Sequence, residues 1–237
     1  MGRIHQLLAT IKEASKQKGI TYVIKRGFYV WLYIIYYKIF CKRRGFTFRG
    51  KKYHYFYDII NNTWMNERSV EVAIVMEIVN KNRDKRILEI GNVLSNYYQV
   101  PHDVVDKYEK APNVINQDVV DFRSDSKYDL IVSISTLEHV GWDEKPRDDG
   151  KISKALENLR NLMKTQGGMM VVTLPLGYNQ VLNRHLNDGT IRFQEQHFLL
   201  RTGKNSWREA SWTEVKEAKF GTPYSGANGL VVGINSS

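Results

Sequence analysis

Short, mostly apolar runs bounded by polar or turn residues recur along the chain. They cover residues 86–90, 103–106, 130–135 and 169–174. Runs of this length are typical of strands that are buried on both faces, as strands in the interior of a parallel sheet are. The pattern therefore predicts four buried strands.

Two longer segments between these runs are predicted helices. Residues 67–79 are apolar over a length that favours a buried helix over a strand. From Ile152 to Met163, apolar residues recur every three or four positions, which is the spacing of one helical face, and Gly167 and Gly168 follow as end signals. Strands that alternate with helices predict an α/β fold, a doubly wound, mostly parallel Rossmann-like sheet covered on both faces.

The C-terminal region predicts one more helix and one more strand. Ser211 and Glu214 have the spacing of a capping box, which predicts a helix that continues to Lys219. The apolar residues 230–234 then predict a final antiparallel strand. No internal repeat is visible in the sequence.

Charge divides the 237 residues into two parts. Residues 1–55 contain 13 Lys and Arg against one acid, Glu13, whereas residues 56–237 contain 22 Lys and Arg against 24 Asp and Glu. We therefore expect a basic N-terminal arm, 1–55, and a nearly neutral domain, 56–237. The single cysteine, Cys41, excludes an internal disulfide framework and fits a reducing compartment, and no signal peptide is recognisable, so we expect a cytoplasmic protein.

The arm contains an aromatic segment, FYVWLYIIYYKIF, at residues 28–40, with Lys and Arg at 25–26 and 42–44 on its flanks. As a helix it would reach about 20 Å, too short for the roughly 30 Å core of a bilayer. Aromatic rings bounded by cations are typical of a membrane interface, so residues 20–52 are predicted to contact a membrane surface peripherally. Packing on the main domain or a partner subunit and contact with nucleic acid remain alternatives, and both helix and strand are open.

The loops at the carboxyl ends of the predicted strands are where a ligand is expected. The first strand ends in Glu89 and is followed by Gly91, which allows close approach of the backbone. Asp106 lies 17 residues after Glu89, about where a carboxylate would accept both hydroxyls of a ribose. Asp118 adds a third acid that is suited to an amino group.

Two segments around the third and fourth predicted strands resemble those of a known protein family. YDLIVSISTLEHV at 128–140 and NLMKTQGGMMVVTLP at 161–175 resemble the class I S-adenosylmethionine-dependent methyltransferases, and the likeness covers roughly residues 67–176. The family usually has two or three glycines in the first loop, whereas LEIGNVLS keeps only Gly91. This loop looks like a variant in methyltransferase-like proteins of polysaccharide-modification clusters.

The resemblance implies S-adenosylmethionine as the cofactor. Glu89 and Gly91 would lie at its methionine end, Asp106 at the ribose, and Asp118 with the backbone of Val119 at the adenine. The full set of implied cofactor-binding residues is Glu89, Gly91, Asn92, Asp106, Asp118, Val119 and Ser135. Residues 67–71, at the start of the preceding helix, would fold over the cofactor.

The acceptor is expected beside the fourth- and fifth-strand loops. His139 is the candidate catalytic base for a hydroxyl acceptor. Aromatic and amide side chains in these loops suit a sugar. The candidate acceptor-binding residues are Trp142, Asp143, Tyr178, Asn179 and Arg184, and His185 and His197 follow in the same region.

No metal site is predicted. His102, Asp103 and Asp106 are close in sequence, but the two aspartates are three positions apart on a predicted strand and so point to opposite faces.

These inferences predict methyl transfer, specifically O-methylation of a sugar in a polysaccharide or lipid-linked glycan at the cytoplasmic face of a membrane. One alternative is a binding or scaffolding module without catalysis. A second is a nucleic-acid methyltransferase delivered by the basic arm, which the nearly neutral domain makes less favourable. The oligomeric state is not predicted.

Overall fold

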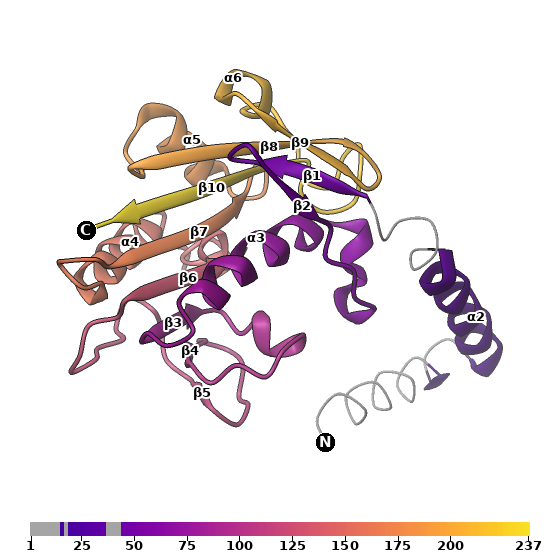
Figure 1. Ribbon diagram of the computed structural model, residues 1–237, viewed down its shortest axis with the longest axis horizontal. Coiled ribbons are helices and arrows are strands. Elements are labelled where there is room, and N and C mark those ends of the chain that lie inside the picture. The colour runs from indigo at the N-terminus through magenta and orange to yellow at the C-terminus, as the bar shows by residue number, and fades with distance from the viewer. Residues whose placement is uncertain (1–14, 17–18, 37–43) are drawn as a thin grey trace.

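The computed structural model describes residues 15–16, 19–36 and 44–237 (Figure 1). An eight-stranded sheet forms its centre, in the order β5-β4-β3-β6-β7-β10-β8-β9. The strands are β3 (Ile87–Ile90), β4 (Asp103–Val105), β5 (Val114–Ile115), β6 (Leu130–Ile134), β7 (Met169–Pro175), β8 (Glu195–Gly203), β9 (Ser206–Ala210) and β10 (Gly229–Ser236). Neighbouring strands from β5 to β7 are parallel, whereas β10 is antiparallel to both β7 and β8. The predicted Rossmann-like fold with its final antiparallel strand is confirmed.

The two faces of the sheet hold separate apolar cores because successive side chains of a strand point to opposite faces. Leu130, Val132 and Ile134 of β6 belong to the core under α3 (Arg68–Lys81). Ile131 belongs to the core under α4 (Lys151–Leu162). Both predicted helices are confirmed, and together they fix the central strands whose carboxyl ends carry the site.

The predicted C-terminal helix is shorter than expected. The capping box of Ser211 and Glu214 is present and begins α6 (Trp212–Val215). The helix ends at Val215 and does not continue to Lys219, which instead forms an antiparallel bridge with Thr222. The capping box therefore starts a single helical turn, and Lys219 lies four residues beyond its end.

Part of the basic arm packs into the core. The hairpin β1 (Gly45–Phe48) and β2 (Lys51–His54) was not predicted. Phe46 and Phe48 are buried in the same core as α3. The backbone N–H of Trp207 in β9 donates to the hydroxyl of Tyr55 at 2.9 Å. Residues 45–55 therefore contribute to the packing of the sheet.

The aromatic segment of the arm is helical as far as it is described. Helix α2 (Ile20–Tyr36) includes residues 28–36, so the open choice between helix and strand is settled there, while residues 37–40 lie outside the described part of the chain. Figure 1 draws α2 apart from the sheet. Among the described helices, none combines the length and hydropathy that crossing a bilayer requires.

Candidate functional site

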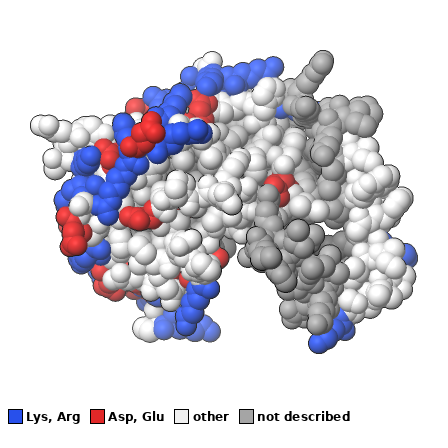
Figure 2. All heavy atoms as spheres, turned by 60° about the horizontal axis from the view of Figure 1, so that its bottom comes forward, with Lys and Arg blue, Asp and Glu red and all other residues white. Residues whose placement is uncertain are grey.

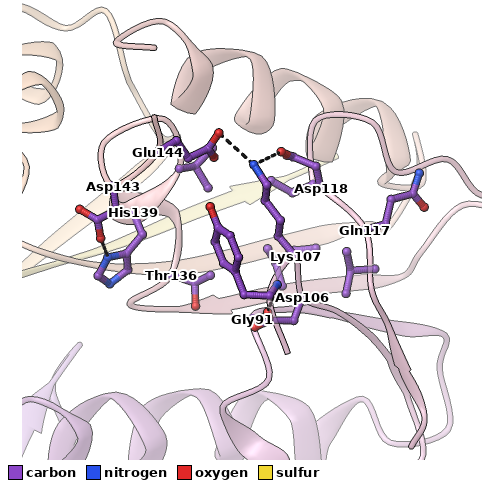
Figure 3. A pocket seen from close by; sticks show the side chains of 14 residues that line it. Gly91, Asp106, Lys107, Gln117, Asp118, Thr136, His139, Asp143 and Glu144 are labelled. Atoms are coloured by element: carbon purple, nitrogen blue, oxygen red, sulfur yellow. Dashed lines mark hydrogen bonds and ion pairs between the residues drawn. The ribbon is translucent and has the colours of Figure 1, made fainter. Parts of the chain in front are cut away.

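A cavity of about 490 Å³ opens at the carboxyl edge of the parallel strands. The loops after β3, β4, β5 and β6 line it (Figure 3). Of the predicted site residues, Gly91, Asp106, Asp118, Val119, His139 and Asp143 line this cavity. Residues that are far apart in the sequence thus meet at one place, and the remaining predicted residues lie outside its lining.

Gly91 allows two loops to touch beside the cavity. Its φ of 82° is in the left-handed region that favours glycine. A Cβ at this position would collide with the side chain of Thr136, in the loop after β6. The backbone N–H of Gly91 donates to the carbonyl of Val105 at 2.8 Å. Glycine is therefore required here by both the backbone angle and the close approach.

Asp106 directly follows β4 and holds two loops in place. One carboxylate oxygen accepts hydrogen bonds from the backbone N–H groups of Tyr108 and Glu109, both at 2.8 Å. The other accepts from the backbone N–H of Asn92 at 3.2 Å. A carboxylate has about four lone-pair sites, so Asp106 keeps capacity for a further donor from the cavity.

Four charged side chains form a closed ring, and three of them, Lys107, Asp118 and Glu144, line one wall of the cavity. This charge ring consists of Lys107, Asp118, Glu144 and Lys151. Lys107 Nζ lies 2.8 Å from Asp118 and 2.9 Å from Glu144 (Figure 3). Lys151 Nζ lies 2.6 Å and 2.5 Å from the same two carboxylates. Burial alone would raise the pKa of Asp118, but the two lysines outweigh it and lower that pKa to about 2.

The ring has consequences for the predicted role of Asp118. One of its oxygens accepts from the backbone N–H of Val120 at 3.1 Å, and the other faces both lysines. An amino group in the cavity would therefore share this carboxylate with Lys107 and Lys151. Neither lysine was predicted to belong to the site, because nothing in the local sequence distinguishes it from a solvated surface lysine.

Glu89 lies inside the fold and does not line the cavity. One oxygen accepts from the backbone N–H groups of Val93 and Leu94, at 2.9 and 2.7 Å, at the start of the short helix η3 (Leu94–Asn96). The other oxygen lies 2.9 Å from Nε2 of His102. Its carboxylate therefore shapes the loop after β3 from beneath.

Asn92 and Ser135 also lie outside the cavity lining. The Asn92 side chain donates to Glu109 at 2.8 Å. Ser135 follows β6 with a φ of 38°, which is unusual for a residue with a side chain, and its hydroxyl donates to Glu71 at 2.5 Å. Strained backbone of this kind persists where the surroundings hold it and is concentrated at functional sites. Here the buried bond to Glu71 holds the turn that leads to His139.

His139 ends the short helix η4 (Leu137–His139) and forms a hydrogen-bonded pair with Asp143. Its Nδ1 lies 2.5 Å from Oδ2 of Asp143 (Figure 3), and the hydroxyl of Tyr178 donates to the same oxygen at 2.7 Å. Burial works against the charge of Asp143, but these two partners lower its pKa. Burial, together with the bond to Asp143, raises the pKa of Tyr178 to about 12. This arrangement orients the imidazole and leaves Nε2 for another partner.

Two buried acids, Glu67 and Glu71, lie at the start of helix α3. Glu71 is fully buried and accepts from the hydroxyls of Ser135 and Thr173, while its second oxygen pairs with Arg68 at 2.9 Å. Glu67 accepts from the backbone N–H of Ala227 at 2.8 Å. Neither acid lines the cavity, so the start of α3 supports the site from below.

Glu138 differs from these acids. Its side chain is buried, and within the described part of the chain its Oε2 has no hydrogen-bond partner. Burial raises its pKa well above the usual value. Its Oε1 lies 3.6 Å from Nε2 of His139, which is too long for a direct hydrogen bond.

The other predicted acceptor residues have structural partners. Trp142 stacks under the guanidinium of Arg147, 3.4 Å from the ring centroid. Asn179 caps helix α5 (Gln180–Asp188), where its side-chain oxygen accepts from two backbone N–H groups at 2.9 Å. Arg184 is exposed on α5 and does not line the cavity.

The remaining histidines, and Asp103 of the group considered for a metal, lie outside the cavity lining. His185 is on α5, and His197 is on β8, where it lies 3.2 Å from Glu195. Asp103, the first residue of β4, accepts from the hydroxyl of Tyr128 at 2.8 Å and lies at the opposite end of the strand from the cavity. Within the described residues, no cluster of His, Cys, Asp and Glu has the arrangement of a metal site.

The comparisons with known proteins found matches only among solved structures. No family model and no curated protein sequence matches the chain. The N-methyltransferase NodS from Bradyrhizobium japonicum, in complex with S-adenosyl-L-homocysteine, is 11% identical, with a TM-score of 0.39 over 68% of this chain and 84% of that chain. A sugar N-methyltransferase from Streptoalloteichus is 13% identical, with a TM-score of 0.34 over 71% and 88%. An S-adenosylmethionine-dependent methyltransferase from Clostridium acetobutylicum is 12% identical, with a TM-score of 0.37 over 87% and 98%. At these values the likenesses do not identify the reaction or the acceptor of this chain.

Proposed function

We propose that the chain is a class I S-adenosylmethionine-dependent methyltransferase. The observation that carries this proposal is the convergence of Gly91, Asp106, Asp118 and Val119 on one cavity, in the chain order that the family resemblance implies. The cavity lies at the carboxyl edge of a parallel sheet, where such folds bind their ligands. Its volume of about 490 Å³ lies within the usual range of small-molecule sites.

The donor set of the cavity fits this cofactor. Asp106 would hold the ribose hydroxyls, because it is fixed by three backbone N–H groups and keeps acceptor capacity. Asp118 and the backbone of Val119 would receive the adenine, with Lys107 and Lys151 holding the Asp118 carboxylate in place. When bound, the cofactor supplies a sulfonium methyl group as the electrophile.

The pair of His139 and Asp143 supports a hydroxyl acceptor. Asp143 keeps the proton of His139 on Nδ1, so Nε2 can accept the proton that an acceptor hydroxyl loses. Tyr178 fixes Asp143 through its hydroxyl and packs its ring against the imidazole at 4.8 Å. Asp143 and Tyr178, expected from the sequence to bind the acceptor, would therefore act as positioning residues.

The acceptor we propose is a sugar of a polysaccharide or lipid-linked glycan, methylated on oxygen at the cytoplasmic face of a membrane. Support comes from the aromatic surface near His139, formed by Tyr178 and Phe220, whose rings pack at 5.1 Å. An aromatic face of this kind suits the C–H groups of a sugar. The exposed basic and aromatic helix α2 supports the membrane setting.

Calorimetric titration with S-adenosylmethionine and S-adenosylhomocysteine tests the cofactor site. We expect micromolar binding by the wild type and a loss of about tenfold or more in Asp106→Asn, which keeps the shape of the side chain but removes its charge. Asp125→Ala is the matched control, because Asp125 is exposed and outside the cavity. Absence of heat from the folded wild type would favour the non-catalytic module.

Transfer of a labelled methyl group to an extracted cell-envelope glycan tests the acceptor. We expect His139→Asn to reduce the rate by about 10² to 10⁴ while cofactor affinity stays within a few-fold, since a general base acts in the chemical step. Labelling of nucleic acid and not of the glycan would overturn the sugar acceptor and support the alternative enzyme.

A further inference from the structure

Helix α2 exposes a row of large apolar side chains. Ile20, Ile24, Phe28 and Trp31 follow one another at spacings of four, four and three residues, which places them on one face. They are 68%, 66%, 57% and 57% exposed, respectively. Helices of globular proteins normally bury such a face. Nothing in the described part of the chain covers this one.

The opposite face of α2 has a different composition. Lys25, Tyr29 and Tyr36 recur at spacings of four and seven residues, and all three are exposed. The helix contains no acidic residue. An apolar face with Trp and Phe, opposed by a face with a lysine and tyrosines, is the composition of helices that lie in a membrane interface.

The charge distribution distinguishes between a membrane and a second copy of the chain. Residues 1–44, which precede the packed hairpin, contain 10 Lys and Arg against one acid, so two copies would bring like-charged segments together. An anionic lipid surface attracts the same charges. Along one flank of the rest of the molecule, basic and acidic side chains are interleaved (Figure 2), so positive charge is concentrated in the arm.

The two faces of α2 favour one way of meeting the bilayer. Its 17 described residues span about 26 Å, against roughly 30 Å for the hydrocarbon core. By lying parallel to the surface, such a helix buries its apolar face among the lipids and keeps the face with Lys25 in contact with water and lipid headgroups.

We propose that α2 binds an anionic membrane surface and lies in its plane, with the face of Ile20, Ile24, Phe28 and Trp31 inserted among the lipids. This inference rests on the membrane setting in the proposed function and not on methyl transfer itself. The bound helix would bring the cavity to acceptors that are attached to the same surface.

Co-sedimentation of the full chain with lipid vesicles tests this proposal. The probes are vesicles of phosphatidylcholine alone and of phosphatidylcholine mixed with phosphatidylglycerol, at low and high salt. We expect binding to the anionic vesicles that weakens with salt, because the attraction of Lys25 and its basic neighbours is screened. Trp31→Glu should reduce the fraction bound by about tenfold, since it places a charge in the inserted face.

Tyr29→Glu is the matched control, because it adds the same charge to the same helix at an exposed position on the other face. We expect a loss of no more than about threefold from its charge alone. Equal losses in both variants would overturn the proposed orientation. A wild type that ignores anionic vesicles and sediments as a dimer, with Trp31→Glu monomeric, would overturn the membrane in favour of a second copy. Vesicle binding does not depend on cofactor binding, so failure here and failure of the proposed reaction are distinguishable.

Discussion

Charged groups on the cavity wall and charged groups beneath the cavity are stabilised in different ways. On the wall, Asp118 and Glu144 each face two lysines, and all four side chains keep some contact with solvent. Beneath the cavity, Glu71 and Glu138 are buried, and Arg68 is the cation beside them. Long lysine side chains can follow a carboxylate that moves, whereas a buried carboxyl depends on fixed hydroxyls or on remaining neutral.

This difference separates the charged groups that stabilise the fold from those that can contact a ligand. Glu71 has a partner for each oxygen, and these bonds hold the strained turn at Ser135. Among the described residues, Glu138 has no hydrogen-bond partner for one oxygen, a cost that a purely structural residue would not be expected to carry. The members of the charge ring neutralise one another, and three of them also line the cavity.

The largest expected effect is on Glu71. Glu71→Leu leaves Arg68 and two hydroxyls without their buried partner, so we expect the free energy of unfolding to fall by about 3 to 5 kcal/mol. Urea denaturation measures this change. Glu157→Leu, at an exposed position of α4, is the control and should stay within about 0.5 kcal/mol of the wild type. A loss no larger than the control's would remove the distinction between wall and interior.

The next effect concerns the pH dependence of Glu138. Burial raises its pKa above the ordinary 4.5, so the folded state holds a proton that the unfolded state releases. Stability is then lost as pH rises from about 4.5 through the folded-state pKa. Glu138→Gln never ionises, so its stability relative to the wild type should increase over this range by about 1.4 kcal/mol for each pKa unit of the shift. Urea denaturation at several pH values measures the difference, and a constant difference would contradict the prediction.

A smaller effect is expected when Glu138 is made apolar. Glu138→Leu removes a buried oxygen for which the described part of the chain offers no hydrogen-bond partner, so we expect the free energy of unfolding to stay the same or rise by about 1 kcal/mol. Thermal and urea denaturation both report this change, and Glu71→Leu provides the contrast. Strong destabilisation would mean that Glu138 is as structural as Glu71.

The smallest effect is expected in the charge ring. Lys107 is the more exposed of the two lysines. When Lys107 is replaced, Lys151 still neutralises the same two carboxylates. We expect Lys107→Met to cost less than about 1 kcal/mol, and less still at high salt. Lys151→Met, at the more buried position, should cost more. If Lys107→Met cost more stability than Lys151→Met at both low and high salt, the ring would not act as one unit.

The sequence predicted the central sheet because its strands are short apolar runs with clear boundaries. β3, β4, β6 and β7 and helices α3 and α4 were all predicted within a few residues. The hairpin at 45–54 was missed because its residues are mostly basic and aromatic, and burial of Phe46 and Phe48 depends on contacts with distant strands. Strands β8 and β9 were missed for a related reason, since their side chains alternate weakly between buried and exposed.

The site was predictable where a residue's role follows from its position at a strand end. Gly91, Asp106 and Asp118 belong to this group, because loops after parallel strands meet at one edge. The partners of these residues were not predictable, since a lysine at position 107 or 151 looks like any solvated lysine in the sequence. The link between Asp143 and His139 required the loop geometry after β6, which a one-dimensional pattern does not contain.

Because apolar cores lie on both sides of β6, the residues that stabilise the fold are largely different from those that determine what the cavity binds. The alternating residues of this strand are committed to the cores, while the cavity is bordered by the loops that leave the sheet. Substitutions at polar positions of those loops, such as Lys107 and Gln117, change shape and charge at the cavity without removing apolar contacts from the interior. A descendant of this chain can therefore acquire a new acceptor through loop changes alone and inherit the same scaffold intact.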